Sequence, residues 1–282
     1  MTLKHRVFNL YRQYVWLLSR VGRSVRTDST NMANDLYLIT IAFNHVGLIE
    51  RQIKLVKKYV KDVSFKHVIV DNSPDKGVRR DIQRTCEREN VEYIGVPMYI
   101  NKLMSCKLFG YGLSHGAALN WTFYHFLKQR NPQYLVLLDH DVFPLKEYSF
   151  YEKLGKRVFY GVERNMGAGW YLWPGWSVFR FEVMRGKKLD FLPIFMGDTY
   201  LDAGGGNYKQ LYCHYNLNDI IFPVVKTKRI RKTKGLNTHV DIYHGDCIQY
   251  IDDSWMHIIN GSNYANISGK DNYVNQILEG LA

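Results

Sequence analysis

Two aspartates one residue apart, Asp139 and Asp141, have the side-chain type and spacing that best suit chemistry in this sequence. They follow the mostly apolar run 134–138, which is typical of a buried strand in a parallel sheet. Residues two apart in an extended chain point to the same side, so we expect the two carboxylates to share one face. Such hard oxygen ligands suit Mg²⁺ or Mn²⁺, which commonly hold substrate phosphates. A polar turn after a strand is the alternative interpretation.

Polar residues also follow two earlier predicted strands. Asn44 comes after the strand 36–43, and Asp71 and Asn72 come after the strand 67–70. Ligands of open α/β sheets bind beyond the carboxyl ends of the strands, where these side chains can accept hydrogen bonds from a base or a ribose. Each of them is also a common turn residue. The sequence has no glycine-rich dinucleotide fingerprint and no Walker lysine loop.

The second half of the chain supplies three further kinds of candidate. Trp173 and Trp176 lie in a stretch rich in Gly and Trp, and their rings can stack on a sugar or pack in the core. Asp198 and Asp202 lie close to glycines, and each is either a general base or an ordinary turn residue. The imidazole of His257 is a reasonable Mn²⁺ ligand beside two carboxylates, although a lone His is more often structural.

The elements that must position these residues alternate between two patterns. Hydrophobic periodicity predicts strands and helices in turn along the first half of the chain. The predicted strands cover 36–43, 67–70, 91–95 and 134–138, and the predicted helices cover 48–60, 77–90 and 114–129. This alternation predicts an α/β fold with a mostly parallel sheet flanked by helices.

The N-terminal residues 1–26 form a basic, amphipathic segment, and a polar linker follows to residue 33. Apolar residues recur at helical spacing and predict one stripe, formed by Val7, Leu10, Tyr14, Leu17 and Val21. The apolar run is too short to span a bilayer and lacks the features of a secretory signal. The pattern therefore predicts a helix that lies in an anionic membrane interface, or one that packs on its own domain or on a partner subunit.

The chain of 282 residues carries a formal net charge of +12, which indicates an anionic partner. A phosphorylated substrate, a nucleic acid and an acidic membrane surface all fit this charge. The densest basic run, 226–234, suits a diphosphate or a membrane surface, or is a solvated loop. We expect no nucleic-acid partner, because no aromatic residue is interleaved in the run. The four cysteines show no metal-site spacing and indicate a reduced, cytoplasmic protein.

The order of the motifs resembles one known family. A strand ending in Phe43-Asn44 is followed by Val70-Asp-Asn-Ser73, by Gly116-Ala-Ala-Leu-Asn120 on a helix and by Leu137-Leu-Asp-His-Asp141. This order resembles GT-A-fold glycosyltransferases, and it is most similar to the family-2-like enzymes, which include the bacterial rhamnosyltransferase type. The resemblance covers about residues 35–145. At its middle position, His140 departs from the Ser, Ala or Asp that the family often has.

The resemblance implies roles for the residues at the strand ends. Asp71 would hold the nucleoside of a sugar nucleotide, together with Asn44, Asn72 and Asp139. Asp139 and Asp141 would hold Mn²⁺ or Mg²⁺ on the diphosphate.

Further roles implied by the resemblance fall on the second half of the chain. A C-terminal His that returns to the site in this family would be His257, with His244 the weaker match. In this family the catalytic base usually lies in an acidic motif, which would fall near Asp202 and Asp198 in this sequence. The sequence departs there from the commonest form of the motif, Glu-Asp. Of these two, Asp202 is the first choice for the base.

The same resemblance implies a function and an organisation. A sugar would pass from a nucleotide diphosphate donor to a glycan or lipid-linked acceptor, with inversion, in the synthesis of cell-surface polysaccharide or glycoconjugate. The donor would bind in a half covering 34–145 and the acceptor in a half covering 146–282, after the N-terminal segment 1–33. We expect a cytoplasmic protein at the inner face of a membrane. The alternatives are another phosphate-handling enzyme, such as a nucleotidyltransferase, and a non-catalytic basic adaptor for membrane or nucleic acid.

Overall fold

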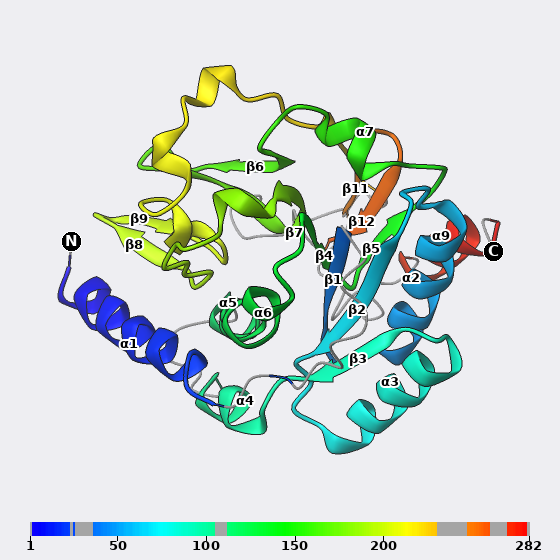
Figure 1. Ribbon diagram of the computed structural model, residues 1–282, viewed down its shortest axis with the longest axis horizontal. Coiled ribbons are helices and arrows are strands. Elements are labelled where there is room, and N and C mark those ends of the chain that lie inside the picture. The colour runs from blue at the N-terminus through cyan, green and yellow to red at the C-terminus, as the bar shows by residue number, and fades with distance from the viewer. Residues whose placement is uncertain are drawn as a thin grey trace, which may run out of the picture.

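A six-stranded sheet forms the centre of the molecule (Figure 1), and its strand order is β3–β2–β1–β4–β7–β6. The computed structural model describes residues 2–22, 25, 36–104, 112–229, 247–259 and 270–280. The strands are β1 (Leu36–Ala42), β2 (Phe65–Asp71), β3 (Glu92–Gly95), β4 (Tyr134–Asp139), β6 (Phe159–Asn165) and β7 (Trp170–Arg180). The first four are parallel, whereas β7 runs antiparallel to both β4 and β6. The predicted α/β class with a mostly parallel sheet is therefore confirmed.

Helices cover both faces of this sheet, as Figure 1 shows. The α-helices of the described residues are α1 (Leu3–Ser19), α2 (Val46–Tyr59), α3 (Lys76–Arg88), α4 (Met98–Met104), α5 (Gly112–Thr122), α6 (Lys128–Arg130), α7 (Phe150–Leu154) and α9 (Lys270–Glu279). Strand β1 shows why both faces must be covered. Ile39 and Ile41 pack with α5 residues on one face, and Leu36 and Leu38 pack with Val56 of α2 on the other. A strand buried on both sides reads as a continuous apolar run.

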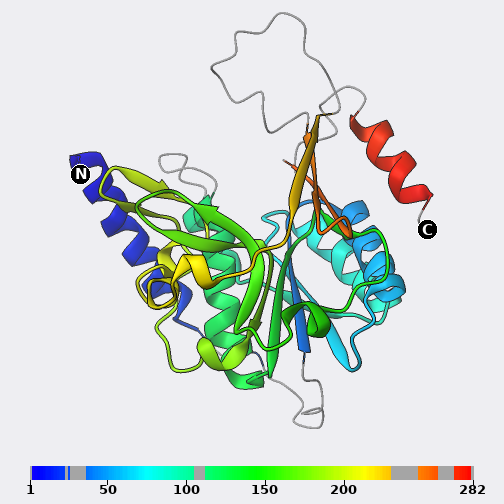
Figure 2. The same cartoon turned by 90° about the horizontal axis from the view of Figure 1, so that it is seen from above.

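A second, antiparallel sheet adjoins the first, in the order β10–β11–β12–β5. Its strands are β5 (Val142–Pro144), β10 (Val225–Arg229), β11 (Cys247–Ile251) and β12 (Trp255–Ile258). Figure 2 shows β10 and β11 projecting from the body of the molecule. Strand β5 follows β4 after two residues, so the two sheets meet at Asp139–Val142. The central sheet contains strands from both sides of residue 145, the expected boundary between the two halves of the chain, because β4 pairs with β7.

Helix α1 is an integral part of the fold, packed against α5 and the hairpin of β8 (Ile194–Met196) and β9 (Thr199–Leu201). The side chains that it buries are Phe8, Arg12, Val15 and Ser19. Thr2 caps its N-terminus, where the hydroxyl accepts a hydrogen bond from the His5 amide at 3.3 Å. None of the described helices has the length and apolar content that crossing a membrane requires.

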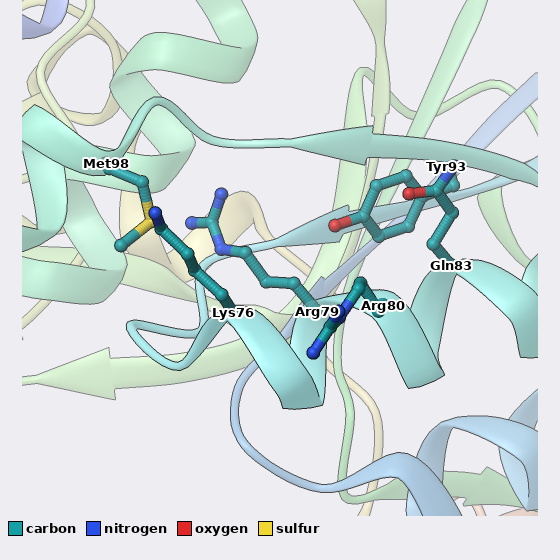
Figure 3. A pocket seen from close by; sticks show the side chains of 6 residues that line it. All are labelled: Lys76, Arg79, Arg80, Gln83, Tyr93 and Met98. Carbon is teal, nitrogen blue, oxygen red and sulfur yellow. The ribbon is translucent and has the colours of Figure 1, made fainter.

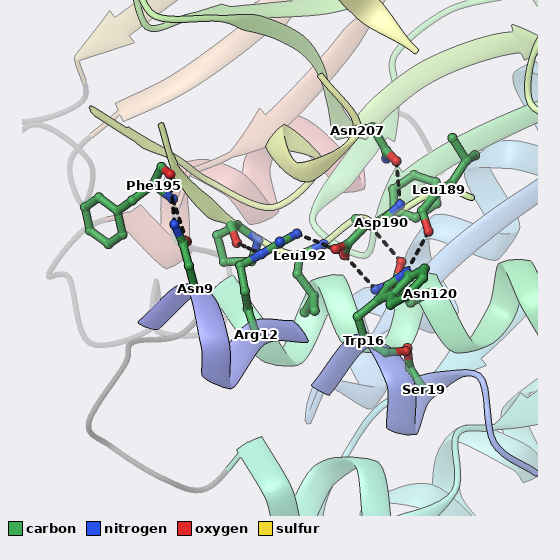
Figure 4. Close-up of polar contacts among 12 residues, drawn as sticks. Asn9, Arg12, Trp16, Ser19, Asn120, Leu189, Asp190, Leu192, Phe195 and Asn207 are labelled. Carbon is green, nitrogen blue, oxygen red and sulfur yellow. Dashed lines mark hydrogen bonds and ion pairs between the residues drawn. The ribbon is translucent and has the colours of Figure 1, made fainter. Parts of the chain in front are cut away.

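Polar contacts fix the inner face of α1 (Figure 4). The Arg12 guanidinium pairs with Asp190 and donates through Nε to the Pro193 carbonyl at 2.7 Å. The Trp16 indole N–H donates to the Leu189 carbonyl at 2.9 Å. Burial raises the pKa of Asp190, and the charge of Arg12 opposes that rise. A buried charge paired in this way holds one register of the helix on the domain.

Candidate active site at the carboxyl edge of the sheet

Asp139 and Asp141 lie where the two sheets meet. Asp139 is the last residue of β4, and His140 and Asp141 form a turn before β5 begins at Val142. The extended geometry assumed for the two carboxylates therefore ends at Asp139, and the turn sets the direction of the Asp141 side chain. Strand β12 holds the turn from one side, since the Ile258 amide donates to the Asp141 carbonyl at 2.9 Å.

Gln52 of α2 holds the same turn from the other side. Its side-chain amide donates to the carbonyls of Asp139 and Val142, at 2.7 Å each. Its carbonyl accepts the hydroxyl of Thr40 at 2.8 Å, and that hydroxyl lies 3.0 Å from His67 Nε2. The Thr40 hydroxyl has one hydrogen and gives it to Gln52, so the His67 nitrogen must be the donor. This fully buried network fixes the backbone that carries the two aspartates.

The two carboxylates are close enough to affect each other. The pKa of Asp139 is raised to about 8, first by burial and then by the negative charges of Asp141 and Asp202, against the positive charges of His140 and Arg164. Two buried carboxylates cannot both ionise cheaply, and a bound cation removes the conflict. The site is therefore suited to a positive group.

Two histidines flank the aspartates. His115 of α5 places Nε2 at 3.2 Å from Asp139 Oδ1, and burial lowers the pKa of this histidine to about 4. His257 of β12 places Nε2 at 3.8 Å from Asp141 Oδ1. The other ring nitrogen of His257 lies 3.0 Å from Gln249 Oε1, which fixes the orientation of the ring. His115 was missed in the sequence because nothing in a helix sequence shows which face meets a strand end.

Trp173 brings an aromatic face to the aspartates. The centroids of the Trp173 and His257 rings lie 4.4 Å apart. The guanidinium carbon of Arg164 lies 5.3 Å from the centroid of the Trp173 ring. Gly175 makes the approach possible. A Cβ at that position would meet Trp173 at 2.1 Å and the Asp139 carboxylate at 2.5 Å. Only glycine leaves room there for both side chains.

The two candidate bases lie in different places. Asp202 follows β9, and its amide donates to the Tyr171 hydroxyl at 3.0 Å. Its charge acts on both Asp139 and His115, so it faces the same site. Asp198 is exposed at the β8–β9 turn and pairs with His5 of α1 at 3.1 Å. The structure thus brings Asp202 to the aspartate pair and Asp198 to the N-terminal helix.

The three polar residues of the predicted nucleoside site form one turn network. Asp71 is fully buried and accepts hydrogen bonds from the Ser73 amide at 2.8 Å and the Tyr93 hydroxyl at 3.0 Å. The Asn72 side chain donates to the Ser114 hydroxyl at 2.9 Å, and the Asn44 amide donates to the Ser73 hydroxyl at 2.8 Å. Asp71 pairs in register with Ala42 of β1, two residues before Asn44. These contacts shape the edge of the sheet.

Beside this turn lies a pocket of about 410 Å³ that the sequence did not suggest. Figure 3 shows its lining, which is Lys76, Arg79, Arg80, Gln83, Tyr93 and Met98. Arg79 holds the turn, because its Nε donates to the Ser73 carbonyl at 2.5 Å. The cations come from the first half of α3, which the sequence predicted as a helix over 77–90.

Trp176 has a different environment from Trp173. Its ring is 0% exposed and packs against Tyr148, Phe150, Tyr160 and Trp255. The expectation that it stacks on a sugar is not supported, because no ring face is left for a ligand. Core packing, the alternative interpretation, describes Trp176. Of the basic run 226–234, β10 includes 226–229 as an exposed strand; residues 230–234 and His244 lie outside the described residues.

The aspartate pair was tested for its fit to a divalent cation. Within the residues that the structure describes, no three Asp, Glu, His or Cys side chains are arranged to hold a metal ion. Mg²⁺ and Mn²⁺ are often bound by one or two carboxylates, with substrate phosphates and water in the other positions. The raised pKa of Asp139 beside Asp141 fits such a two-carboxylate site. The donor set suits the cation when a phosphorylated substrate completes it.

Several solved structures are similar to this chain. The mannosyltransferase PcManGT from Pyrobaculum calidifontis, solved with GDP-Man and Mn²⁺, is 16% identical, with 63% of this chain and 54% of that chain covered and a TM-score of 0.36. The mannosyltransferase Ktr4p from S. cerevisiae, solved with GDP, is 10% identical, with 65% and 68% covered and a TM-score of 0.36. The galactosyltransferase LgtC, solved with donor and acceptor sugar analogs, is 13% identical, with 53% and 59% covered and a TM-score of 0.38.

The chain thus spans little more than half the length of two of these proteins. No protein-family model matches the sequence, and no curated protein matches it. We therefore base the function on the geometry of the site itself.

Proposed function

We propose that this protein is a metal-dependent GT-A-type glycosyltransferase that takes a sugar from a nucleotide diphosphate donor. One observation carries the proposal. At the carboxyl edge of a mostly parallel sheet, a pair of aspartates, one buried and one half-buried, meets an aromatic ring, an oriented histidine and a further carboxylate. These residues are Asp141, Asp139, Trp173, His257 and Asp202. Paired carboxylates suit a divalent cation, an aromatic ring suits stacking on a sugar, and a further carboxylate suits proton transfer.

Asp139 and Asp141 are the residues that would hold Mn²⁺ or Mg²⁺, and His257 Nε2 lies 3.8 Å from the Asp141 carboxylate. The cation would neutralise negative charge on the diphosphate leaving group. Gln52 keeps the two aspartates at fixed positions through its bonds to the backbone of the turn. Gln249 keeps the His257 ring turned so that Nε2 faces Asp141.

The turn of Asp71, Asn72 and Asn44 is the proposed nucleoside side of the site. Asp71 acts there through the Ser73 amide and Tyr93 hydroxyl that it holds, because its own carboxylate is buried. Strand β1 lies between β2, which ends at Asp71, and β4, which ends at Asp139. A nucleoside on the turn and a diphosphate at the aspartates would thus span the ends of these three adjacent strands.

The proposed transfer is a single displacement at the anomeric carbon. The oxygen of the acceptor hydroxyl bonds to the anomeric carbon, and Asp202 accepts the proton of that hydroxyl. The bond between the anomeric carbon and the nucleoside diphosphate breaks. The configuration of the sugar inverts. Trp173 offers a ring face to the sugar or acceptor. The acceptor is a glycan or a lipid-linked saccharide of the cell surface.

Thermal denaturation with a panel of nucleoside diphosphates, with and without Mn²⁺, tests the donor site. A ligand that binds only the folded state raises the melting temperature. We expect one nucleotide to raise it in the presence of Mn²⁺, and Asp141→Ala to remove that rise. The control is Asp253→Ala, an exposed carboxylate paired with Lys226. If no nucleotide shifts the transition with or without metal, the proposal is wrong.

The products of turnover separate the proposal from its nearest rival. A glycosyltransferase, or its slow hydrolysis of the donor, releases a nucleoside diphosphate. A nucleotidyltransferase releases pyrophosphate. We expect nucleoside diphosphate, with turnover reduced at least about a hundredfold in Asp202→Ala, since a positioned base contributes 10²- to 10⁴-fold. Nucleotide binding should persist in that variant.

A further inference from the structure

The outer face of α1 carries a row of exposed apolar side chains. They are Leu3, Val7, Leu10, Tyr14, Leu17 and Val21, and each is between 45% and 78% exposed. Among the described residues, twelve large hydrophobic side chains are exposed, and these six are half of them. Five of the six fall within one helix of 17 residues. A patch so concentrated marks an interaction surface.

This row is held rigidly, because the opposite face of α1 is fixed to the domain. Two contacts hold the inner face of the helix on the domain, namely the ion pair of Arg12 with Asp190 and the hydrogen bond of Trp16 to the Leu189 carbonyl (Figure 4). Asn9 exchanges hydrogen bonds with Phe195 of β8 at 3.1 and 3.2 Å. The helix cannot turn its apolar row inward without breaking these contacts. The exposure is a built feature of the fold.

The charges beside the row decide which partner fits. Lys4, Arg6 and Arg20 are exposed, and the helix contains no acidic residue. The row also repeats at the 3- and 4-residue spacing of a coiled-coil seam. In an antiparallel pair of such helices, the cations of both copies would flank one seam, with no acidic residue in either helix to compensate them. An anionic surface compensates all three charges at once.

We propose that the outer face of α1 docks on the surface of an anionic lipid bilayer. The helix, about 25 Å long at 1.5 Å per residue, would lie parallel to the surface. Its apolar row would enter the boundary between headgroups and acyl chains, and Lys4, Arg6 and Arg20 would contact the anionic headgroups. Tyr14, in the middle of the row, has the amphipathic ring that suits this depth.

Docking would also place the proposed acceptor side of the enzyme near the bilayer. The β8–β9 hairpin packs on α1, and Asp202 directly follows it. A lipid-linked acceptor would then reach the base from the surface on which the protein sits. This last step rests on the proposed function, whereas bilayer docking does not.

The test is co-sedimentation of the full chain with vesicles, in the absence of nucleotide. We expect binding to vesicles of phosphatidylcholine mixed with phosphatidylglycerol, weak binding to phosphatidylcholine alone, and a decrease with added salt. Leu10→Gln with Leu17→Gln should lower the partition coefficient about a hundredfold, at about tenfold for each leucine that no longer enters the lipid. Lys4→Gln with Arg6→Gln should lower it about fivefold per charge.

The matched control is Ile221→Gln with Val224→Gln, which removes two apolar side chains of similar exposure outside α1. We expect this variant to bind vesicles as the parent does. All changed residues are exposed, so melting temperatures should stay close to that of the parent, which shows that the variants fold. The proposal would be overturned if Leu10→Gln with Leu17→Gln bound vesicles as well as the control variant does, or if the parent did not bind vesicles.

Light scattering distinguishes the rival occupant. A parent dimer that Leu10→Gln with Leu17→Gln converts to a monomer, together with no vesicle binding, would assign the row to helix pairing between two copies. Loss of nucleoside diphosphate release with intact vesicle binding would refute the proposed activity and leave the docking surface standing.

Discussion

Replacement of Gln52 by methionine tests how the aspartate turn is held. Gln52 is fully buried and supplies two donors and one acceptor: two bonds to the carbonyls of Asp139 and Val142, and one from the Thr40 hydroxyl. Methionine has a similar volume and makes none of these bonds. The change therefore removes the polar contacts and leaves little cavity.

The cost follows from the three partners that lose a bond. A buried polar group left unsatisfied costs about 1 to 3 kcal/mol. At about 1 to 1.5 kcal/mol each, the three partners give a loss of about 3 to 5 kcal/mol in the free energy of unfolding. That is a large part of the 5 to 15 kcal/mol typical of a folded domain. For a chain of this size it lowers the melting temperature by about 10 °C.

Urea denaturation followed by tryptophan fluorescence measures this loss. The matched control is Gln83→Met, because Gln83 is exposed and its side chain donates to Glu87 of its own helix at 2.9 Å. We expect the control to change stability by less than about 0.5 kcal/mol. A loss below about 1 kcal/mol in Gln52→Met would refute the inference that Gln52 holds the turn.

A second measurement separates positioning from stability. At a temperature where Gln52→Met is fully folded, the Mn²⁺ concentration for half-maximal nucleoside diphosphate release should rise at least about tenfold, because the two aspartates are no longer held at fixed positions. Gln83→Met should show the parent value. An unchanged Mn²⁺ requirement in a folded Gln52→Met protein would mean that the turn keeps its shape without the clamp.

Three further outcomes are expected. Gly175→Ala should lower turnover at least about tenfold, because a Cβ would meet Trp173 at 2.1 Å, whereas Gly47→Ala, with open space around it, should keep turnover at the parent level. Burial, and then the charge of Lys57, lowers the pKa of His67 to about 3 from a usual 6.5. The unfolded chain therefore binds this proton at a higher pH than the folded chain does, and the free energy of unfolding falls as the pH drops from 6.5 towards 3. In urea titrations, His67→Phe should remove about 1.4 kcal/mol per pH unit from that fall, and equal slopes for the variant and the parent would contradict the burial argument. Arg12→Met should lower the free energy of unfolding by about 3 to 5 kcal/mol, measured by urea denaturation, because it leaves the Asp190 charge without its partner. Lys54→Met, which breaks the surface pair with Glu50, should lower it by less than about 1 kcal/mol. Equal losses in the two variants would mean that the Arg12 pair is not effectively buried.

The strands and helices of the first half could be predicted because their patterns are local. Strand β4 is an apolar run ending at an aspartate, and it lies at 134–139 as the run indicates. The predicted helix 114–129 is found as α5, a π-helical segment at Phe123–Leu127 and α6. The local pattern gave the helix but not the π-helical segment. That segment depends on packing, since the His125 carbonyl accepts the Val25 amide at 3.1 Å.

The site could be predicted only where a residue follows a strand. Asp139 and Asp141 could be found because they follow β4 at the carboxyl edge of the central sheet. Asp202 follows β9 of a separate two-stranded sheet, and the packing of that hairpin brings its charge to Asp139. Gln52, His115 and Arg164 come from elements whose facing depends on tertiary packing. No periodicity in the sequence shows that a glutamine inside a helix will bond two carbonyls 87 and 90 residues away.

The same limit decides the two tryptophans. Trp173 and Trp176 lie three residues apart on β7, in a segment where the register of β7 against β6 is irregular. Neither composition nor strand alternation could therefore show which of the two rings is buried in the core. The structure places Trp176 among four other aromatic rings, while Trp173 lies with His257 at the aspartate pair.

Helix α1 shows that an apolar stripe does not by itself identify the buried face. The sequence left open whether the stripe lies in an anionic membrane interface, packs on its own domain or packs on a partner subunit. In the structure the opposite face of α1 packs on the domain, and the stripe is exposed. The inner face includes Arg12, a charge whose burial is tolerable only because Asp190 meets it. Since that pair fixes the rotation of the helix, the apolar row must point outward. The apolar residues of the outer face are then available to a second surface, and the cations beside them select an anionic one.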